Sequence, residues 1–424
     1  MYFVLKMAGL VFSRISGIVS NQLFWVLIVV IILLYKKTSN IEQTMLQKRL
    51  SLMDKVSSAL FNGFIGGLFG SFLVIMLGIT IERYATYNQS VFSSGILYIW
   101  IIAILFSLIN ARYLCFSYSG GLVALVSLLI GIPNVYVPGL MALIGILHLI
   151  ESFLIWIDGY SFSVPIFLKN KSGKIVGGYI MNRMWPIPLV LTVLAFPVAG
   201  VISYFSSETM PGWWPLLKQY QAFAYMPYLV PVVLGYGDVA LTQTPENRCR
   251  KSAGRLAAYS IILIALSVAA SKWIAFAYIA ALFSPIAHEA LIIWGRKEEE
   301  QGKPLYDASG EGICLLYIRE DSPAKQMGLL PGDKILSINN NKVDNESQLA
   351  EFLSSYPTFI WMDVKRADGS IKVIEYKNYN VGIKSLGILV VPRDASICFE
   401  INDGSSPALG LLKKLFHKSI NIAK

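Results

Sequence analysis

Two histidine–carboxylate pairs lie in apolar stretches of this sequence, and their side chains are suited to metal binding or proton transfer. His148 and Glu151 are three positions apart, which places both on one face of a helix. His288 is followed directly by Glu289. Polar side chains at membrane depth are costly, so they suggest a function. A mixed metal site of all four is one interpretation, but we favour hydrogen bonds between helices and predict no metal and no cofactor.

The segment that begins at His288 resembles half of a zinc-protease motif. A site-2-type intramembrane protease needs a second histidine one helical turn after the first, with a glutamate base between them. Ile292 occupies that position, and the chain has three histidines in all. No nucleophile elbow, Ser/Lys dyad or phosphate-binding loop occurs in its required context either, so the sequence contains no catalytic motif of these kinds.

The composition of the chain indicates a membrane protein. Of its 424 residues, 55% are hydrophobic and 15% are charged, whereas soluble domains are about 25% charged. The net charge of +10 comes mostly from Lys and Arg at the ends of apolar segments, where they contact lipid headgroups, so we predict no nucleic-acid partner. Four cysteines without metal-ligand spacing are interpreted as small apolar residues in a reducing compartment: Cys115, Cys249, Cys314 and Cys398.

Nine apolar windows approach the roughly 20 residues that a membrane-spanning helix needs. Two of them are short or interrupted by Pro227 and Pro231, so we expect eight to nine transmembrane helices. These prolines could also break a helix around a transport site, and a transporter or sensor is therefore a third alternative. The windows are residues 18–35, 60–81, 91–109, 113–131, 136–157, 185–205, 220–236, 256–270 and 273–294.

Segments around these windows complete the predicted domain organisation. Residues 1–20 are expected to form an amphipathic interfacial helix, and residues 21–295 the multipass membrane domain. Small residues at Gly63, Gly66, Gly67 and Gly70 indicate close helix packing. Five basic residues follow the first window and only Arg83 follows the second, which predicts an external N-terminus and a cytoplasmic C-terminal part. A charged linker, residues 296–304, separates the membrane domain from this C-terminal part.

The C-terminal part changes to short strands and turns. Strands are predicted at residues 313–318, 334–338, 359–365, 371–376 and 386–391, with short helices after Ser322 and around residues 348–353. The run Ser322-Pro323-Ala324, the turn Gly328 to Ile335 and Ser337-Ile338-Asn339 resemble a bacterial PDZ domain over residues 305–392, leaving 393–424 as a tail. The predicted fold class is an α-helical polytopic membrane domain plus a small α+β PDZ domain.

The PDZ resemblance implies a peptide site. PDZ domains bind an extended peptide as an added strand between a strand and a helix. For any single apolar residue of such a site, a role in the domain core is expected about as often as a role in peptide binding. We choose Gly312-Ile313 as the carboxylate-binding loop, with Leu386-Gly387-Ile388 as the other candidate. The implied peptide-binding residues are Gly312, Ile313, Cys314, Leu315, Leu316, Leu349, Phe352 and Leu353.

Several short stretches resemble the MinJ family, topological determinants of cell division in Gram-positive rods. They are residues 148–152, Gly177-Gly178 with Trp185-Pro186-Ile187-Pro188, and residues 237–240 followed by Thr244-Pro245. The resemblance implies a non-enzymatic multipass scaffold in the bacterial cell membrane, with a cytoplasmic PDZ domain and enrichment at septa and poles. Its implied partners, besides the lipid bilayer, are DivIVA-like and MinD-like division proteins. Whether the protein also forms a homo-oligomer is left open. A PDZ-containing intramembrane protease, or a degenerate relative of one, is the alternative.

Overall fold

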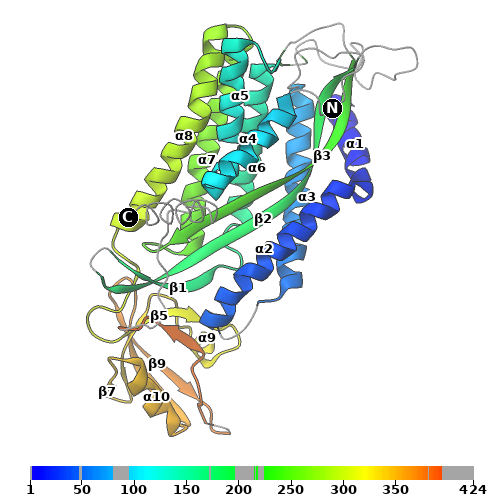
Figure 1. Cartoon of the computed structure of the whole chain (residues 1–424). Helices are drawn as coiled ribbons and strands as arrows, with labels where there is room; N and C mark the ends of the chain where they lie inside the picture. The colour runs from blue at the N-terminus through cyan, green and yellow to red at the C-terminus, as the bar shows by residue number, and fades with distance from the viewer. Residues whose placement is uncertain are drawn as a thin grey trace, which may run out of the picture.

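The computed structural model describes residues 2–46, 50–79, 95–170, 173–195, 214, 216–217, 224–380 and 382–393. A helical part is crossed obliquely by a long β-hairpin and carries a small sheet domain at one end (Figure 1). Two short 3-10 helices accompany the α-helices, at Ser16–Ser20 and Ala111–Leu114. The α-helices of this part are α1 (Tyr2–Ile15), α2 (Gln22–Leu46), α3 (Leu52–Leu77), α4 (Gly95–Ile109), α5 (Phe116–Ile130), α6 (Val137–Asp158), α7 (Pro245–Ala270) and α8 (Ile274–Gln301).

Five helices in the described residues, α2, α3, α6, α7 and α8, are long and apolar enough to cross a bilayer, which indicates a membrane protein. Three shorter apolar helices accompany them, so the predicted count of eight to nine spans is not confirmed. Helix α6 is the central one, because 72% of its apolar window is buried, against 22% for α8. The first of the shorter helices, α1, buries Met7, Val11 and Ile15 against Ile75 and Val190.

Two of the nine predicted helical windows, 185–205 and 220–236, are wrong. Their described residues belong to the strands β2 (Ile175–Ala195) and β3 (Ala224–Ala240), which pair antiparallel from Tyr179 opposite Ala240 to Ala195 opposite Ala224. Prolines that would break a helix are compatible with the edges of a two-stranded ladder. Strand β2 also pairs with β1 (Val164–Lys169) and with β4 (Tyr306–Asp307).

The prolines of the hairpin fall where a backbone donor would have no strand partner. Successive residues of a strand direct their N–H groups to opposite edges. In β2, the N–H of Met184 donates to the Tyr35 hydroxyl at 3.1 Å, and that of Val190 donates to the Ser71 hydroxyl at 2.8 Å. The N–H groups of even-numbered residues in β2 therefore point away from β3. Pro186 and Pro188 share this parity and have no N–H to satisfy. The hairpin can therefore lie among apolar helices without unpaired donors at these positions.

Glycines of α3 pack against this hairpin as well as against another helix. A Cβ atom on Gly63 or Gly67 would collide with the backbone of Pro186 or Pro188. On an adjacent face of α3, Gly66 approaches Ile150 and Leu154 of α6, and Gly70 approaches Ile150. The predicted close packing is present, but half of it is between a helix and a strand.

The C-terminal domain contains an antiparallel sheet with strand order β10-β5-β6-β8-β9, and β7 (Asn341–Lys342) pairs with β6. Its predicted elements are confirmed, with boundaries shifted by a few residues. The linker predicted at residues 296–304 is mostly helical, because α8 continues to Gln301. The elements are β5 (Ile313–Ile318), α9 (Pro323–Gln326), β6 (Lys334–Ile338), α10 (Glu346–Ser354), β8 (Phe359–Lys365), β9 (Ile371–Lys377) and β10 (Ile388–Val390).

Candidate functional site

The strand predicted to receive a peptide, β5, lies inside the sheet. Ile313 and Cys314 pair with β6, while the stretch from Leu315 to Ile318 pairs with β10. The N–H of Leu315 also donates to the Asp333 carbonyl at 2.8 Å. An added peptide strand needs a free edge. In this arrangement β5 does not offer one, whereas β10 has a single strand partner among the described residues.

The two candidate carboxylate-binding loops differ in what surrounds them. The Gly312 N–H donates to the Asp344 carboxylate at 3.3 Å, and Ile313 pairs with Ile335, so the first loop already holds a negative group. The second loop places Gly387 in the left-handed region, at φ 69°, just before β10. A Cβ atom on Gly387 would lie 3.5 Å from the Arg319 Nε, which places a positive charge beside this loop. The second loop therefore has the charge that suits a carboxylate.

The predicted helix residues lie on α10 in different environments. Leu349 and Leu353 are 5% and 8% exposed and belong to the core of the C-terminal domain. Phe352 is half-buried against the same core, as is Ile388 of β10. The side chain of Asn345 accepts a hydrogen bond from the Gln348 N–H and caps this helix. Phe352 of α10 and Ile388 of β10 are thus both apolar, partly exposed and packed against the core of the C-terminal domain.

The C-terminal domain is docked on the base of the β-hairpin. The short strand β4 pairs Tyr306 with Gly177 of β2. The Tyr179 hydroxyl donates to the Leu316 carbonyl at the point where the pairing of β5 with β10 shifts register. A Cβ atom on Gly177 would lie 2.8 to 2.9 Å from side-chain atoms of Leu316, Tyr306 and Val391. The glycine is needed for this close approach, which fixes the sheet domain relative to the helices.

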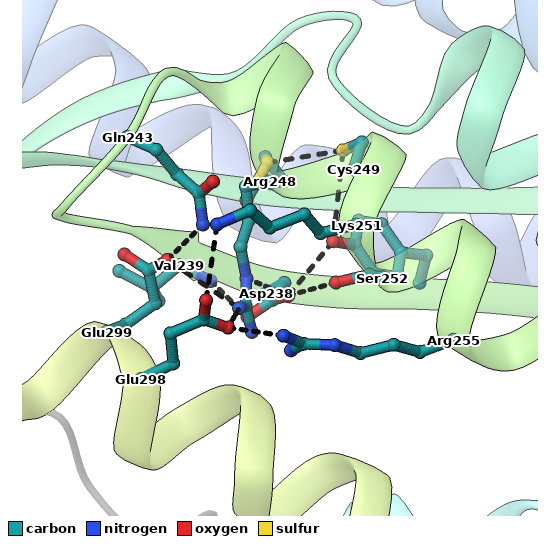
Figure 2. A network of polar contacts seen from close by, with 12 residues as sticks. Asp238, Val239, Gln243, Arg248, Cys249, Lys251, Ser252, Arg255, Glu298 and Glu299 are labelled. Carbon is teal, nitrogen blue, oxygen red and sulfur yellow. Dashed lines mark hydrogen bonds and ion pairs between the residues drawn. The ribbon is translucent and has the colours of Figure 1, made fainter.

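A second set of contacts fixes the polypeptide where it leaves the helical part (Figure 2). Arg248 of α7 donates to both carboxylate oxygens of Asp238 in β3, at 2.7 and 3.1 Å. Its Nη1 lies 3.6 Å from the Glu299 carboxylate near the end of α8. One oxygen of Glu299 accepts the N–H groups of Leu241 and Thr242 at 2.7 and 2.8 Å. Arg248 of α7 therefore joins β3 to α8 through these two carboxylates.

The same network continues towards the C-terminal domain. Glu298 pairs with Arg255 at 2.8 Å and with Lys251 at 3.2 Å (Figure 2). Beyond α8, the Leu305 N–H donates to the Leu241 carbonyl at 2.8 Å, directly before β4. These ion pairs and hydrogen bonds hold the end of α8 and the residues before β4, and they therefore restrict rotation of the C-terminal sheet domain.

A buried ion pair attaches the hairpin to the helices. Arg183 of β2 is fully buried and donates through Nε to the Asp158 carboxylate at 2.9 Å. Trp185 Nε1 donates to the same carboxylate at 2.7 Å, and the Ser58 hydroxyl donates to its other oxygen at 3.2 Å. Because buried charges are costly unless they are paired and hydrogen-bonded, this arrangement fixes the position of β2 relative to α3 and α6.

The predicted polar residues of α6 have different partners. His148 is 2% exposed and contacts Cys115, which precedes α5, and His288 of α8. Glu151 forms no hydrogen bond or ion pair with other described residues, and Glu289 accepts a hydrogen bond from Tyr118 at 2.6 Å. Of the four side chains considered together from the sequence, the two histidines meet. Cys115 joins them, although nothing in its sequence spacing indicated this.

The architecture defines a class: a membrane protein whose apolar helices support a C-terminal PDZ domain. The family model of the PDZ domain matches residues 316–366, which include the second half of β5 and all of α9, β6, α10 and β8. The periplasmic serine endoprotease DegP of Salmonella typhimurium is similar over 64 residues, at 33% identity, which is 15% of this chain. That likeness concerns the PDZ region and does not extend to a protease domain.

Longer similarity exists to cell-division proteins. The cell division topological determinant MinJ of Bacillus subtilis (strain 168) is 24% identical over 260 residues, which cover 61% of this chain and 62% of that protein, less than two thirds of its length. The probable cell division topological determinant MinJ of Lacticaseibacillus paracasei is 22% identical over 270 residues, covering 62% of this chain and 68% of the relative. The chain is therefore MinJ-like, and the relatives are named as topological determinants, not as enzymes.

Proposed function

We propose that this protein is a non-enzymatic membrane scaffold that recruits septum-placement proteins through its PDZ domain. The observation that carries the proposal is the MinJ similarity over about 60% of the chain, combined with a PDZ domain held firmly to the membrane part. In this role it connects DivIVA-like and MinD-like proteins at septa and poles. A fixed PDZ domain suits a scaffold because it presents its ligand site at a constant distance from the bilayer.

The peptide site of the scaffold is the free edge of β10, with α10 as the helix of the site, since PDZ domains bind an added strand between a strand and a helix. Ile388 and Val390 direct their backbone groups away from β5, since Gly387 and Val391 bond to β5 at Arg319 and Cys314. A peptide strand here would lie beside Ile388 and Phe352. Its carboxylate would reach the Leu386-Gly387-Ile388 loop near Arg319. This assignment replaces the edge from Gly312 to Leu316.

The scaffold of this proposal crosses the bilayer several times and holds its PDZ domain in the cytoplasm. Basic residues gather at the PDZ end of the helices: Lys251 and Arg255 near the start of α7, and Arg296 and Lys297 near the end of α8. Such enrichment favours the cytoplasmic side. A cytoplasmic PDZ domain meets division proteins where they assemble.

The alternative of an intramembrane protease is not favoured. Ile292 stands where the zinc-protease motif requires its second histidine, one turn after His288 on α8. The similarity to DegP is limited to the peptide-binding module and brings no catalytic residue with it.

The test is fluorescence localisation of a tagged copy in the native bacterium, together with septum positions in a deletion strain. The proposal predicts enrichment at septa and poles, and misplaced or missing septa when the gene is absent. A copy that lacks residues 305–424 should insert in the membrane but recruit no partner. Uniform membrane fluorescence with normal division would overturn the proposal, and recruitment by the truncated copy would move the binding surface to the membrane part.

A further inference from the structure

We propose that Cys115, His148 and His288 bind a zinc ion in the interior of the helical part. Cys115 directly precedes α5, His148 lies in the middle of α6, and His288 lies in the second half of α8. Their ligand atoms all lie within 4.8 Å of one another. A thiolate and two imidazoles form a donor set that suits Zn²⁺. This inference is independent of the scaffold role and of peptide binding.

The two sulfur–nitrogen distances lie close to that of a tetrahedral site. The Cys115 Sγ lies 3.1 Å from the His148 Nε2 and 3.8 Å from the His288 Nε2. With Zn–S near 2.3 Å and Zn–N near 2.0–2.1 Å, a tetrahedral site separates sulfur from nitrogen by about 3.6 Å. One observed distance is shorter than this value and the other is longer, so small side-chain adjustments would admit the ion.

Both histidines have the second hydrogen bond that metal-binding histidines use. The His148 Nδ1 lies 2.8 Å from the Ile144 carbonyl, which can only accept, so this nitrogen carries the proton and Nε2 has a free lone pair. The His288 Nδ1 lies 3.4 Å from the Tyr118 hydroxyl, which donates to the Glu289 carboxylate at 2.6 Å. That hydroxyl therefore accepts from His288. Outer hydrogen bonds of this kind fix the ring orientation and make the facing nitrogen a better ligand.

The position of Cys115 suits a metal-bound thiolate. Its side chain caps the N-terminus of α5 and accepts the Ser117 N–H at 3.4 Å. The positive end of a helix dipole stabilises a negative sulfur. On binding, Zn²⁺ would replace the thiol proton, which is released to solvent, so the affinity should rise with pH.

A hydrogen-bonded cluster without metal explains the geometry less completely. Cys115 has one thiol proton, while the Nε2 atoms of His148 and His288 both direct a lone pair towards its sulfur. One of the two acceptors would remain without a donor in a largely buried place, which costs free energy. A cation satisfies all three ligands at once. The fourth coordination position would be left for water or for the carboxylate of Glu151, one turn along α6 from His148.

The experiment is metal analysis of the full chain, purified in detergent and dialysed against buffered Zn²⁺. We expect one zinc per chain. With Co²⁺ as the probe, we expect the near-ultraviolet charge-transfer band that a cobalt–thiolate bond produces. Cys115→Ser should remove this band, and His148→Gln or His288→Gln should weaken zinc binding. Tyr118→Phe, which removes an outer hydrogen bond, should weaken it roughly 10- to 100-fold.

Matched controls separate lost ligation from lost folding. Cys249→Ser changes another buried cysteine, and His417→Gln changes the third histidine, outside the described residues; both should keep one zinc. Every variant is compared by size-exclusion chromatography and helical circular dichroism. Absence of stoichiometric zinc in the unsubstituted chain would overturn the inference. So would full zinc retention and an unchanged cobalt band in a folded Cys115→Ser variant.

Discussion

The hydroxyl of Tyr179 in β2 donates a hydrogen bond to the backbone carbonyl of Leu316 in β5. The two residues belong to the base of the β2–β3 hairpin and to the PDZ sheet. Both are buried, and Leu316 packs with the core of the helical part, not with that of its own domain. The PDZ domain therefore shares part of its core with the helical part, and a weaker contact here should make the domain more mobile.

Tyr179→Phe removes this hydrogen bond and keeps the ring. The Leu316 carbonyl is then left buried without this donor, which should cost about 1–3 kcal/mol of docking free energy. Hydrogen exchange of amides in residues 306–318 should become faster. The control is Tyr376→Phe, whose hydroxyl bonds to the exposed Gln326 at 3.1 Å and should matter little. Equal exchange rates in both variants would contradict the assigned role of Tyr179.

Gly177→Ala should weaken the same docking by a steric route. The added methyl group would lie under 3 Å from Leu316, Tyr306 and Val391 side chains, so the PDZ domain must shift. Limited proteolysis between the helical part and the PDZ domain should become faster. Gly237→Ala is the matched control, because a Cβ atom there meets nothing within 4 Å. Identical cleavage rates for the two variants would show that the close approach at Gly177 is unimportant.

Arg248→Gln should destabilise the chain strongly. The side chain is 4% exposed and its guanidinium faces Asp238 and Glu299, so its loss leaves carboxylates without their cation, at a cost of about 3–5 kcal/mol. The midpoint of thermal unfolding in detergent should fall clearly. Arg250→Gln breaks an exposed pair with Glu246, which is worth only about 0–1 kcal/mol. A similar small decrease in both variants would argue against the importance of this network.

Cys314 should be unreactive in the folded protein. Burial raises the pKa of its thiol from 9.0 to about 11, so the thiolate fraction at pH 7 falls roughly 100-fold. Because the thiolate forms as pH rises, labelling by a maleimide should be very slow at pH 7 and increase with pH. The measurement uses a variant in which the other three cysteines are serine. Rapid labelling at pH 7 without denaturant would show that the docked sheet opens readily.

Local patterns predicted the C-terminal domain well. The strands from Ile313, Lys334 and Phe359 have the expected boundaries, because apolar alternation and turn glycines specify them within a few residues. The same reasoning failed for residues 185–205 and 220–236. A continuous apolar run has no period that separates a buried strand from a helix. Prolines interrupt a helix, whereas in the hairpin Pro186 and Pro188 only remove donors from an edge of β2.

The candidate sites depended on contacts that the sequence does not contain. Whether β5 or β10 is the edge strand is decided by pairing between segments that are far apart in the sequence, as with Ile318 and Ile388 or Leu315 and Val390. Cys115 lies 33 residues from His148 and 173 from His288, so no motif spacing connects them. The sequence groups Phe352 with Leu349 and Leu353, but only packing shows that the two leucines belong to the core while Phe352 is partly exposed.

The most direct test of peptide recruitment at β10 compares Ile388→Asp with Val373→Asp, each as the sole copy in the native bacterium. Ile388 borders the free edge of β10, whereas Val373 is 63% exposed on β9 at the opposite end of the sheet. We measure septum position and the recruitment of a fluorescent division protein. We expect Ile388→Asp to reach the membrane but to lose recruitment and misplace septa, while Val373→Asp behaves normally. Normal recruitment and normal septa with Ile388→Asp would contradict a peptide site at this edge.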